Sequence, residues 1–267
     1  MKRTFHIEPT NISQDDVLLC EFSQHHICIA RADAISKKLK GVSYYELRNL
    51  LEPEKLQDIL TAEEIDTSNR LIVSSAFRYV LLIPASQFTE EGARHLFATT
   101  YGSDGEALFF NELPTYNAVL VHAIPQGLMD ILKSLGATNA THLYGCLLQS
   151  NEAAIAGETL FVHFTSKKIY ITAIKDGQLQ LAQTYFYTTP LDVVYYLLSI
   201  GQQYGFSQSN ASVFLSGLIS EDSAMYKELY QYFSNIQFWR PSDKALLPSE
   251  YAPHFFSSLY NLAACAL

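Results

Sequence analysis

The chain has 267 residues, of which 48% are hydrophobic and 17% are charged, with 17 Tyr and 16 Phe. This composition is that of a well-packed globular protein and excludes a disordered chain. The net charge is −9 and the longest basic clusters are pairs such as Lys37-Lys38, which argues against nucleic-acid binding, because phosphate contacts require Lys and Arg gathered on one face.

The N-terminus, the lengths of the apolar runs and the cysteine spacing predict the cellular location of the protein. The N-terminus MKRTFHIEPT has no apolar core of a signal peptide, and no run approaches the roughly 20 apolar residues that span a bilayer. We therefore expect a soluble cytoplasmic protein without direct membrane insertion. The cysteines form no C-x-x-C pair and stand in apolar sequence, so free buried thiols are expected at Cys20, Cys28, Cys146 and Cys265.

Residues 20–32 (CEFSQHHICIARA) and residues 162–174 (VHFTSKKIYITAI) share one pattern. Each is a strand, a polar break of about four residues and a second strand with alternating apolar positions, which predicts a β-hairpin. At a constant offset of 142 residues they match in aromatic, hydroxyl and isoleucine positions: Phe22 and Phe164, Ser23 and Thr165, Ile27 and Ile169, Ile29 and Ile171. The two hairpins predict an internal duplication and a two-lobed protein.

Around the first hairpin, residues 4–8 (TFHIE) predict a lead-in strand. Residues 32–53 predict a loop that feeds a short helix from Tyr44 to Leu51, with Ser43 as the N-cap and Glu46 completing a capping box. The acidic residues 53–68 are interpreted as a weakly helical, solvated segment and not as a site.

An α+β module is predicted between about residue 69 and residue 150. RLIVSSA and FRYVLLIP predict strands, and Pro84 ends the second. Residues 86–101 predict a helix, and EALFFNEL and NAVLVHAIP predict two further strands joined near Pro114. Pro125 opens a helix that Gly136 ends, and ATHLYGCLLQSNEAAIAG leads on through a strand and a helix.

The second lobe is predicted to begin near Gly157. The Asp176-Gly177 turn leads into a third antiparallel strand, and the next helix has an N-cap threonine, a first-position proline and a terminal glycine: Thr188 or Thr189, Pro190 and Gly205. SVFLSG predicts a strand buried on both faces, residues 220–235 predict a helix, IQFW predicts a strand, and YAPHFFSSLYNLAACAL predicts an apolar helix.

This order of elements resembles the repeated lobe of the actin-like fold. The resemblance implies a mixed α/β chain with a two-lobed actin-like ATPase (ribonuclease H-like) fold, duplicated hairpin lobes and an inserted α+β module. The first lobe is predicted over residues 1–156, with the module at about 69–150, and the second over residues 157–267, with the C-terminal helix packing back on the first lobe. In that fold a hairpin from each lobe grips the phosphates of a nucleotide.

The hairpin turns bear on whether a nucleotide binds. Active proteins of this fold carry an Asp-x-Gly type turn in each hairpin, because an acidic group organises the metal and Gly lets backbone amides reach the phosphate. The matching positions here are EFS at residues 21–23 and HFT at residues 163–165, which lack both Asp and Gly. The strand that approaches adenosine matches at FLSG, except that Leu218 replaces a second Gly.

We therefore predict no catalytic residue and no metal site, and we expect Phe22 and Phe164 to fill the cleft. If a nucleotide binds, the predicted cofactor-binding residues are Glu21, Ser23, Thr165, Ser166, Lys167, Ser216 and Gly217. The adjacent His25 and His26 face opposite ways on a strand and are expected to be exposed turn residues. Core or rim positions are expected for four further histidines: His6, His122, His142 and His163.

The sequence resembles a bacterial family of unknown function, DUF3822, in FRYVLLIPASQF, in NAVLVHAIP and in the run from IYITAIKDGQLQLAQTYFYTTPLDVVYYLL to SVFLSG and LYQYF. VLVHAIPQGLMDILKSLG is more distantly similar to the inserted module of cytoplasmic pilus-assembly and secretion-platform proteins. The first resemblance implies an actin-like fold without the usual nucleotide turns and without established catalytic residues. The second implies docking of a membrane protein's cytoplasmic tail.

Two functional hypotheses follow. The leading one is a non-enzymatic cytoplasmic protein of degenerate actin-like fold that needs no cofactor and binds a partner protein through its cleft and inserted module. The alternative is a divergent nucleotide-binding protein or phosphotransferase that takes ATP with magnesium between the hairpins, where Lys167 meets a phosphate as a point charge. A structural assembly subunit differs from these mainly in oligomeric state, on which the sequence is silent.

Overall fold

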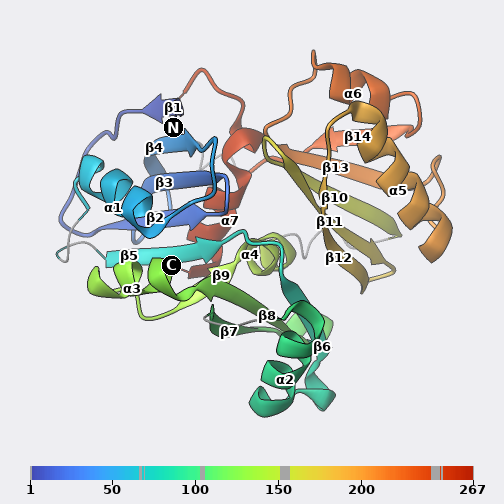
Figure 1. Cartoon of the computed structure of the whole chain (residues 1–267). Helices are drawn as coiled ribbons and strands as arrows, with labels where there is room; N and C mark the ends of the chain where they lie inside the picture. Colours follow the sequence, from blue (N-terminus) through green and yellow to red (C-terminus); the bar gives the residue numbers. More distant parts are fainter. Residues whose placement is uncertain are drawn as a thin grey trace. The chain divides into compact units, whose positions relative to one another are not determined.

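The structure is a computed structural model that describes residues 2–65, 68, 70–102, 106–150, 157–241, 247 and 249–266 (Figure 1). The chain divides into two compact units, each with its own main sheet. The first unit comprises Met1–Gln149, Lys244–Leu247 and Ser258–Leu267, and the second comprises Ser150–Asp243 and Pro248–Ser257.

The main sheet of the first unit has six strands in the order β1-β4-β3-β2-β5-β9. The strands β1 to β4 pair antiparallel, whereas β2, β5 and β9 run parallel. The bounds are β1 (Lys2–Ile7), β2 (Asp16–Phe22), β3 (His26–Asp33), β4 (Leu39–Glu46), β5 (Arg70–Ser75) and β9 (Ala140–His142). Every residue of β2 is buried, as expected for a central strand covered on both faces.

Two helices cover one face of this sheet, α1 (Pro53–Ala62) and α3 (Gln126–Ser134). The segment predicted to be solvated forms α1, whose Pro53 stands in the first turn, where a missing N–H costs nothing. Its Leu56, Ile59 and Leu60 share one face and are buried in the core formed with β2 and β3. Helix α4 (Leu143–Ser150) up to Gln149 and helix α7 (Ser257–Ala266) from Ser258 onward also belong to the first unit. The 3₁₀ turn η5 (Pro253–Phe256), which precedes α7, belongs to the second unit.

A small three-stranded sheet projects from the first unit (Figure 1). Its strands are β6 (Val80–Pro84), β8 (Ala118–Pro125) and β7 (Glu106–Leu113), with β8 in the middle. Helix α2 (Glu90–Tyr101) packs on it through Ala93 and Phe97, and Thr89 accepts a hydrogen bond from the amide of Gly92 as the N-cap. The 3₁₀ turns η1 (Ala85–Gln87) and η2 (Pro114–Tyr116) flank these strands.

The second unit has a five-stranded sheet in the order β12-β11-β10-β13-β14. The bounds are β10 (Glu158–Phe164), β11 (Lys168–Lys175), β12 (Gln178–Phe186), β13 (Ser212–Gly217) and β14 (Asn235–Phe238). Helices α5 (Pro190–Tyr204) and α6 (Ala224–Leu229) contact each other, and their apolar residues join the core of this sheet. Thr189 forms a full capping box with Asp192, and Asp176 and Gly177 both have positive φ, as a tight hairpin turn requires.

Two predicted helices differ from the structure. The helix predicted from Tyr44 to Leu51 is wrong, because Leu39–Glu46 is strand β4, paired with β3 on one side and β1 on the other. The helix predicted over residues 220–235 is shorter, since α6 spans only Ala224–Leu229. The lead-in strand, both hairpins and the capped helix after Thr189 are confirmed.

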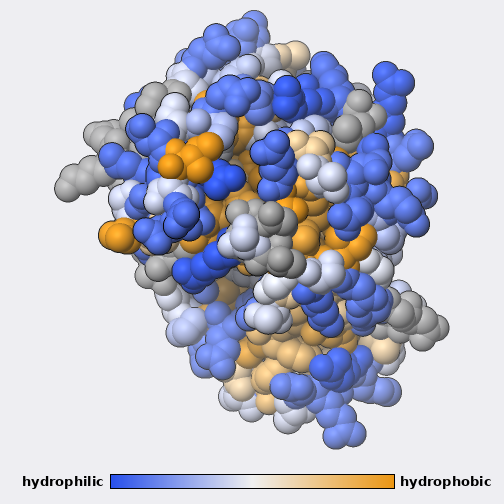
Figure 2. All heavy atoms as spheres, turned by 90° about the vertical axis from the view of Figure 1, so that its left-hand side faces the viewer, coloured by the Kyte–Doolittle hydropathy of each residue, from blue (hydrophilic) through white to orange (hydrophobic). Residues whose placement is uncertain are grey.

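The surface, the helices and the cysteines can each be compared with the sequence predictions. The face in Figure 2 is mainly hydrophilic, with apolar residues showing between the polar ones in its middle and lower parts. No helix in the described part of the chain is long and apolar enough to cross a membrane. All four cysteines are free, as predicted, but Cys265 is exposed while the other three are buried.

Candidate functional site

The two predicted hairpins have the same register. Phe22 pairs with Ile27 between β2 and β3, and Phe164 pairs with Ile169 between β10 and β11. The parallel strand beside each hairpin also has the same register in both copies. Phe22 stands opposite Ser75, and Phe164 stands opposite Gly217. All of these equivalent residues lie 142 positions apart in the sequence.

Both turns are closed by the same hydrogen bonds. The amide of Ser23 donates to the carbonyl of His26 at 2.9 Å, and the amide of Thr165 donates to the carbonyl of Lys168 at 2.9 Å. In return, Ser23 Oγ accepts from the amide of His26 at 3.2 Å, and Thr165 Oγ1 accepts from the amide of Lys168 at 3.2 Å. The hydroxyl shared by the two sequences therefore holds each turn closed.

In the first turn, two predicted site residues join a buried histidine. His26 Nδ1 lies 2.8 Å from Ser23 Oγ, and its Nε2 lies 3.2 Å from Glu21 Oε1. The side chains of Glu21 and His26 are each 3% exposed, and Tyr44 stacks on the imidazole with ring centres 5.6 Å apart. The prediction of exposed turn histidines is wrong for His26, because it begins β3, whose first five residues are all buried, and His25 is half-buried.

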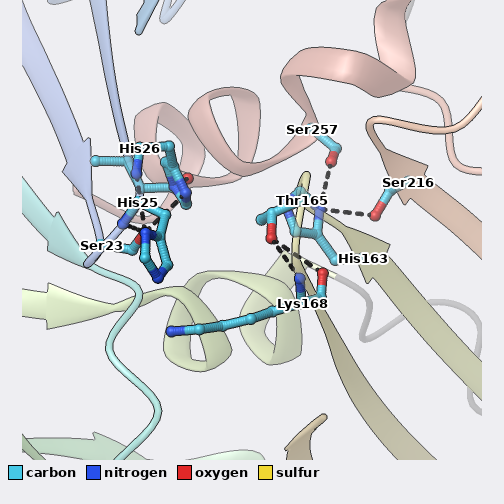
Figure 3. Close-up of polar contacts among 9 residues, drawn as sticks. Ser23, His25, His26, His163, Thr165, Lys168, Ser216 and Ser257 are labelled. Carbon is cyan, nitrogen blue, oxygen red and sulfur yellow. Dashed lines mark hydrogen bonds and ion pairs between the residues drawn. The ribbon is translucent and has the colours of Figure 1, made fainter. Parts of the chain in front are cut away.

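In the second turn, the two neighbouring lysines differ. Lys167 is exposed, whereas Lys168 is 2% exposed, with its Nζ 5.1 Å from the centre of the Phe186 ring. Thr165 Oγ1 donates to the carbonyl of Lys168 at 3.0 Å, so the hydroxyl points back into its own turn (Figure 3). Ser166 is half-buried beside them. The buried Lys168, which stands at the position equivalent to His26, is absent from the sequence prediction.

The other predicted residues of the second unit lie at the ends of β10 and β13. His163 Nδ1 is 3.0 Å from Ser216 Oγ and 3.3 Å from Ser257 Oγ, and Figure 3 shows both hydroxyls directed at this one ring nitrogen. Gly217 has φ +74°, and a Cβ there would lie 2.1 Å from the carbonyl oxygen of Phe164. Only glycine fits this close pass of two strand ends.

The two phenylalanines of the turns do not fill a cleft, and that prediction is wrong. Phe22 lies in the core of the first unit, edge-on to Phe77 with ring centres 5.7 Å apart. Phe164 lies in the core of the second unit, edge-on to Tyr187 at 5.9 Å. Each ring is at most 1% exposed, because strand alternation turns both toward the helices that cover their own sheets.

His122 forms a second buried polar network, in the first unit. Asn111 donates its amide to the carbonyl of Ala140 at 3.2 Å, so its Oδ1 accepts from His122 Nε2 at 3.0 Å. His122 Nδ1 then accepts from the hydroxyl of Ser75 at 2.9 Å. Burial, reinforced by the neighbouring His142, holds the pKa of His122 well below its ordinary value of 6.5.

His142 is bonded at both ring nitrogens as well. Its Nε2 donates to the carbonyl of Phe77 at 2.8 Å, and its Nδ1 accepts from the amide of Tyr144 at 3.1 Å. The prediction of core or rim positions is confirmed, with His122, His142 and His163 buried and His6 half-buried. Within the described ranges, no cluster of three His, Cys, Asp or Glu residues is placed to hold a metal ion.

A model of the DUF3822 family, described as a protein of unknown function, matches residues 7–236. The chain belongs to this family. A search of curated proteins finds no match.

Solved structures similar to this DUF3822 protein share its fold. A Bacteroides thetaiotaomicron protein with an actin-like ATPase fold and unknown function has a TM-score of 0.79 at 19% identity, covering 95% of this chain and 97% of that one. The PilM-PilN type IV pilus biogenesis complex matches with a TM-score of 0.63 at 13% identity, covering 94% and 98%. The ethanolamine utilization protein EutJ from Carboxydothermus hydrogenoformans gives 0.51 at 7% identity, covering 96% and 91%. The chain therefore has the actin-like ATPase fold.

Proposed function

We propose that this DUF3822 protein is a non-enzymatic cytoplasmic protein-binding or assembly-platform module that uses no nucleotide. The observation that carries the proposal is the closure of both hairpin turns. The amide and hydroxyl of Ser23 and of Thr165 are each engaged inside their own turn, with bonds of 2.9 and 3.2 Å in both copies.

A phosphate binds where backbone amides converge on open space, usually with glycine allowing the approach. Here the amide of each hydroxyl residue donates to a carbonyl across the turn. If one of these amides bound a phosphate, its hydrogen bond across the turn would be lost. That loss costs roughly 1 kcal/mol of stability and leaves the carbonyl without its partner. The acidic Glu21 is buried against His26, so it is not presented to a metal ion.

A protein partner is supported by one structural neighbour. PilM was solved in a complex with PilN, and its likeness extends over 94% of this chain. The proposed cytoplasmic location is supported by the four free cysteines, since disulfides are rare in that compartment. The constant offset of 142 residues between equivalent pairs in the two sheets supports an internal duplication.

One observation favours the alternative of ATP binding. Lys167 is exposed at the tip of the second turn, where a point charge is available to a phosphate. Wild type and Lys167→Ala should be compared by thermal unfolding with and without ATP and magnesium. We expect the same melting temperature in all four samples. Stabilisation of the wild type that Lys167→Ala abolishes would instead establish the alternative.

The partner is tested by reconstitution. A protein that co-purifies in a fixed stoichiometry from the native host should be produced separately and mixed with the pure chain. The proposal predicts that the complex forms again without nucleotide. A partner that binds only when ATP and magnesium are present would contradict it, because the platform would then depend on a cofactor.

A further inference from the structure

A cavity of about 300 Å³ opens in the first unit at the C-terminal end of α1. Its other walls are formed by the strands β1 to β4 and by the loop that follows β1. Gly41 gives this loop room, because a Cβ at that position would lie 2.7 Å from the Cα of Pro9. Pockets for small molecules usually measure about 300–1,000 Å³, so this cavity has room for one small ligand.

Arg31 contributes a cation to the lining of this cavity. The residue is half-buried, and it forms no ion pair with any residue in the described part of the chain. Two carboxylates stand close by in the sheet, Asp33 two residues along β3 and Asp16 opposite Asp33, but Lys40 Nζ holds both, at 3.4 and 2.6 Å. A half-buried guanidinium that lacks a carboxylate partner is suited to bind the carboxylate of a ligand.

The end of α1 gives the cavity a negative wall. Glu63 accepts hydrogen bonds from the hydroxyls of Ser43, at 3.0 Å, and Tyr45, and because both donors are neutral these bonds leave its charge in place. Glu64 also lines the cavity and forms no ion pair within the described ranges. The last turn of α1 has no basic residue, so the partial negative charge of the helix end adds to these carboxylates. This wall favours an ammonium group.

The rest of the lining is apolar or already engaged. Arg3 interacts with the hydroxyl of Tyr45, and His6 Nε2 lies 2.7 Å from Glu8 Oε1. Apolar side chains complete the lining: the buried Leu18, Ile29 and Val42, and Ile12, which is 62% exposed. Apolar side chains beside a few oriented charges are typical of a site for a small molecule.

We propose that this cavity binds a free α-amino acid with an apolar side chain. The carboxylate of the ligand binds Arg31, its ammonium group binds Glu64, and its side chain packs on Ile12. A ligand that is only an anion would meet the carboxylates of Glu63 and Glu64, and a ligand that is only a cation would meet Arg31, whereas a zwitterion matches both charges. No residue of the two hairpin turns lines the cavity, so this proposal is independent of the proposed function.

The first test uses the wild type alone. Isothermal titration calorimetry of the full chain with leucine, valine, methionine and phenylalanine should show saturable binding of at least one of them. Its amide, which lacks the carboxylate, and its deaminated acid, which lacks the ammonium group, should each bind at least about tenfold more weakly, because a charged hydrogen bond is lost. The proposal is overturned if none of the four binds below about 10 mM, or if either analogue binds as tightly as the amino acid.

Two variants then assign the charged groups. Arg31→Met should weaken binding of the amino acid at least about tenfold and should remove the preference over its amide. Glu64→Gln should remove the preference over the deaminated acid. Arg48→Met, at an exposed residue that does not line the cavity, is the control and should bind as the wild type does. A folded Arg31→Met protein that keeps the wild-type affinity overturns the proposal, and if that variant is unfolded, the comparison of ligands in the wild type decides.

Discussion

Thr165 Oγ1 both accepts from the amide of Lys168 at 3.2 Å and donates to the carbonyl of the same residue at 3.0 Å. A hydroxyl that bonds both backbone groups of one residue fixes the turn, and its single proton is then not available to donate to a phosphate. In the first hairpin, Ser23 Oγ likewise accepts a hydrogen bond from the amide of His26. The polar residues that both sequences keep in their turns are thus explained by folding.

Thr165→Ala should destabilise the protein by about 1 kcal/mol, because it removes a buried hydroxyl and leaves the amide of Lys168 without that bond. Thr165→Ser keeps the hydroxyl and should restore most of the loss. Urea unfolding followed by circular dichroism measures both. Equal stability of wild type and Thr165→Ala would show that the hydroxyl does not hold the turn.

Gly217→Ala should cost more than an ordinary glycine substitution. The new Cβ meets the carbonyl of Phe164 at 2.1 Å, and the backbone has φ +74°. We expect a loss of about 2–4 kcal/mol. Gly136→Ala is the matched control, because its φ of +88° is also positive but nothing lies within 4 Å of the new Cβ. A loss at Gly217 no larger than at Gly136 would contradict the close approach of the strand ends.

The two lysines of the second turn should differ in their effect on stability. Lys168 is buried against Phe186, so Lys168→Ala should lower the free energy of unfolding by about 1–3 kcal/mol through lost packing. Lys167 is exposed, and Lys167→Ala should leave the stability unchanged. Chemical denaturation of the two variants measures the difference. The opposite order would mean that the turn is arranged differently in solution.

The stability should fall in mild acid because of His122. Burial lowers the pKa of His122 in the folded protein, so below about pH 6.5 the unfolded chain takes up a proton that the folded chain does not. The free energy of unfolding is then unaffected by this residue above that pH and drops by up to about 1.4 kcal/mol per pH unit below it. The buried His254, whose pKa is also lowered mainly by burial, adds to the slope.

Denaturation at pH 7.5, 6 and 5 tests this effect in wild type and in His122→Gln. The variant should be less stable at pH 7.5 and should show a shallower fall toward pH 5. His95→Gln, on the exposed face of α2, is the control and should keep the wild-type dependence. An identical slope in wild type and His122→Gln would remove His122 as the cause.

Local signals in the sequence predicted much of the fold. The Asp176-Gly177 turn and the cap at Thr189 depend on backbone conformations that few residues adopt, so short stretches specify them. The helix predicted after Ser43 failed because its capping pattern was overridden by pairing of β4 with two other strands, which no local pattern reports.

The candidate site was less predictable. Strand alternation and a turn pattern identified Ser23 and Thr165, and both lie where expected in their hairpins. The burial of His26 and Lys168 was missed, because a polar residue at a strand start gives no sign of which side the tertiary structure covers. The available signal for both residues was that His26 and Lys168 occupy equivalent positions, 142 residues apart, in the two hairpins.

Isothermal titration calorimetry of the full chain with ATP and magnesium decides whether the protein binds a nucleotide. We expect no saturable heat up to about 1 mM ATP, corresponding to binding weaker than about −4 kcal/mol. Saturable binding in the micromolar range that is lost in Lys167→Ala would contradict it and would make this protein a nucleotide-binding member of the actin-like fold.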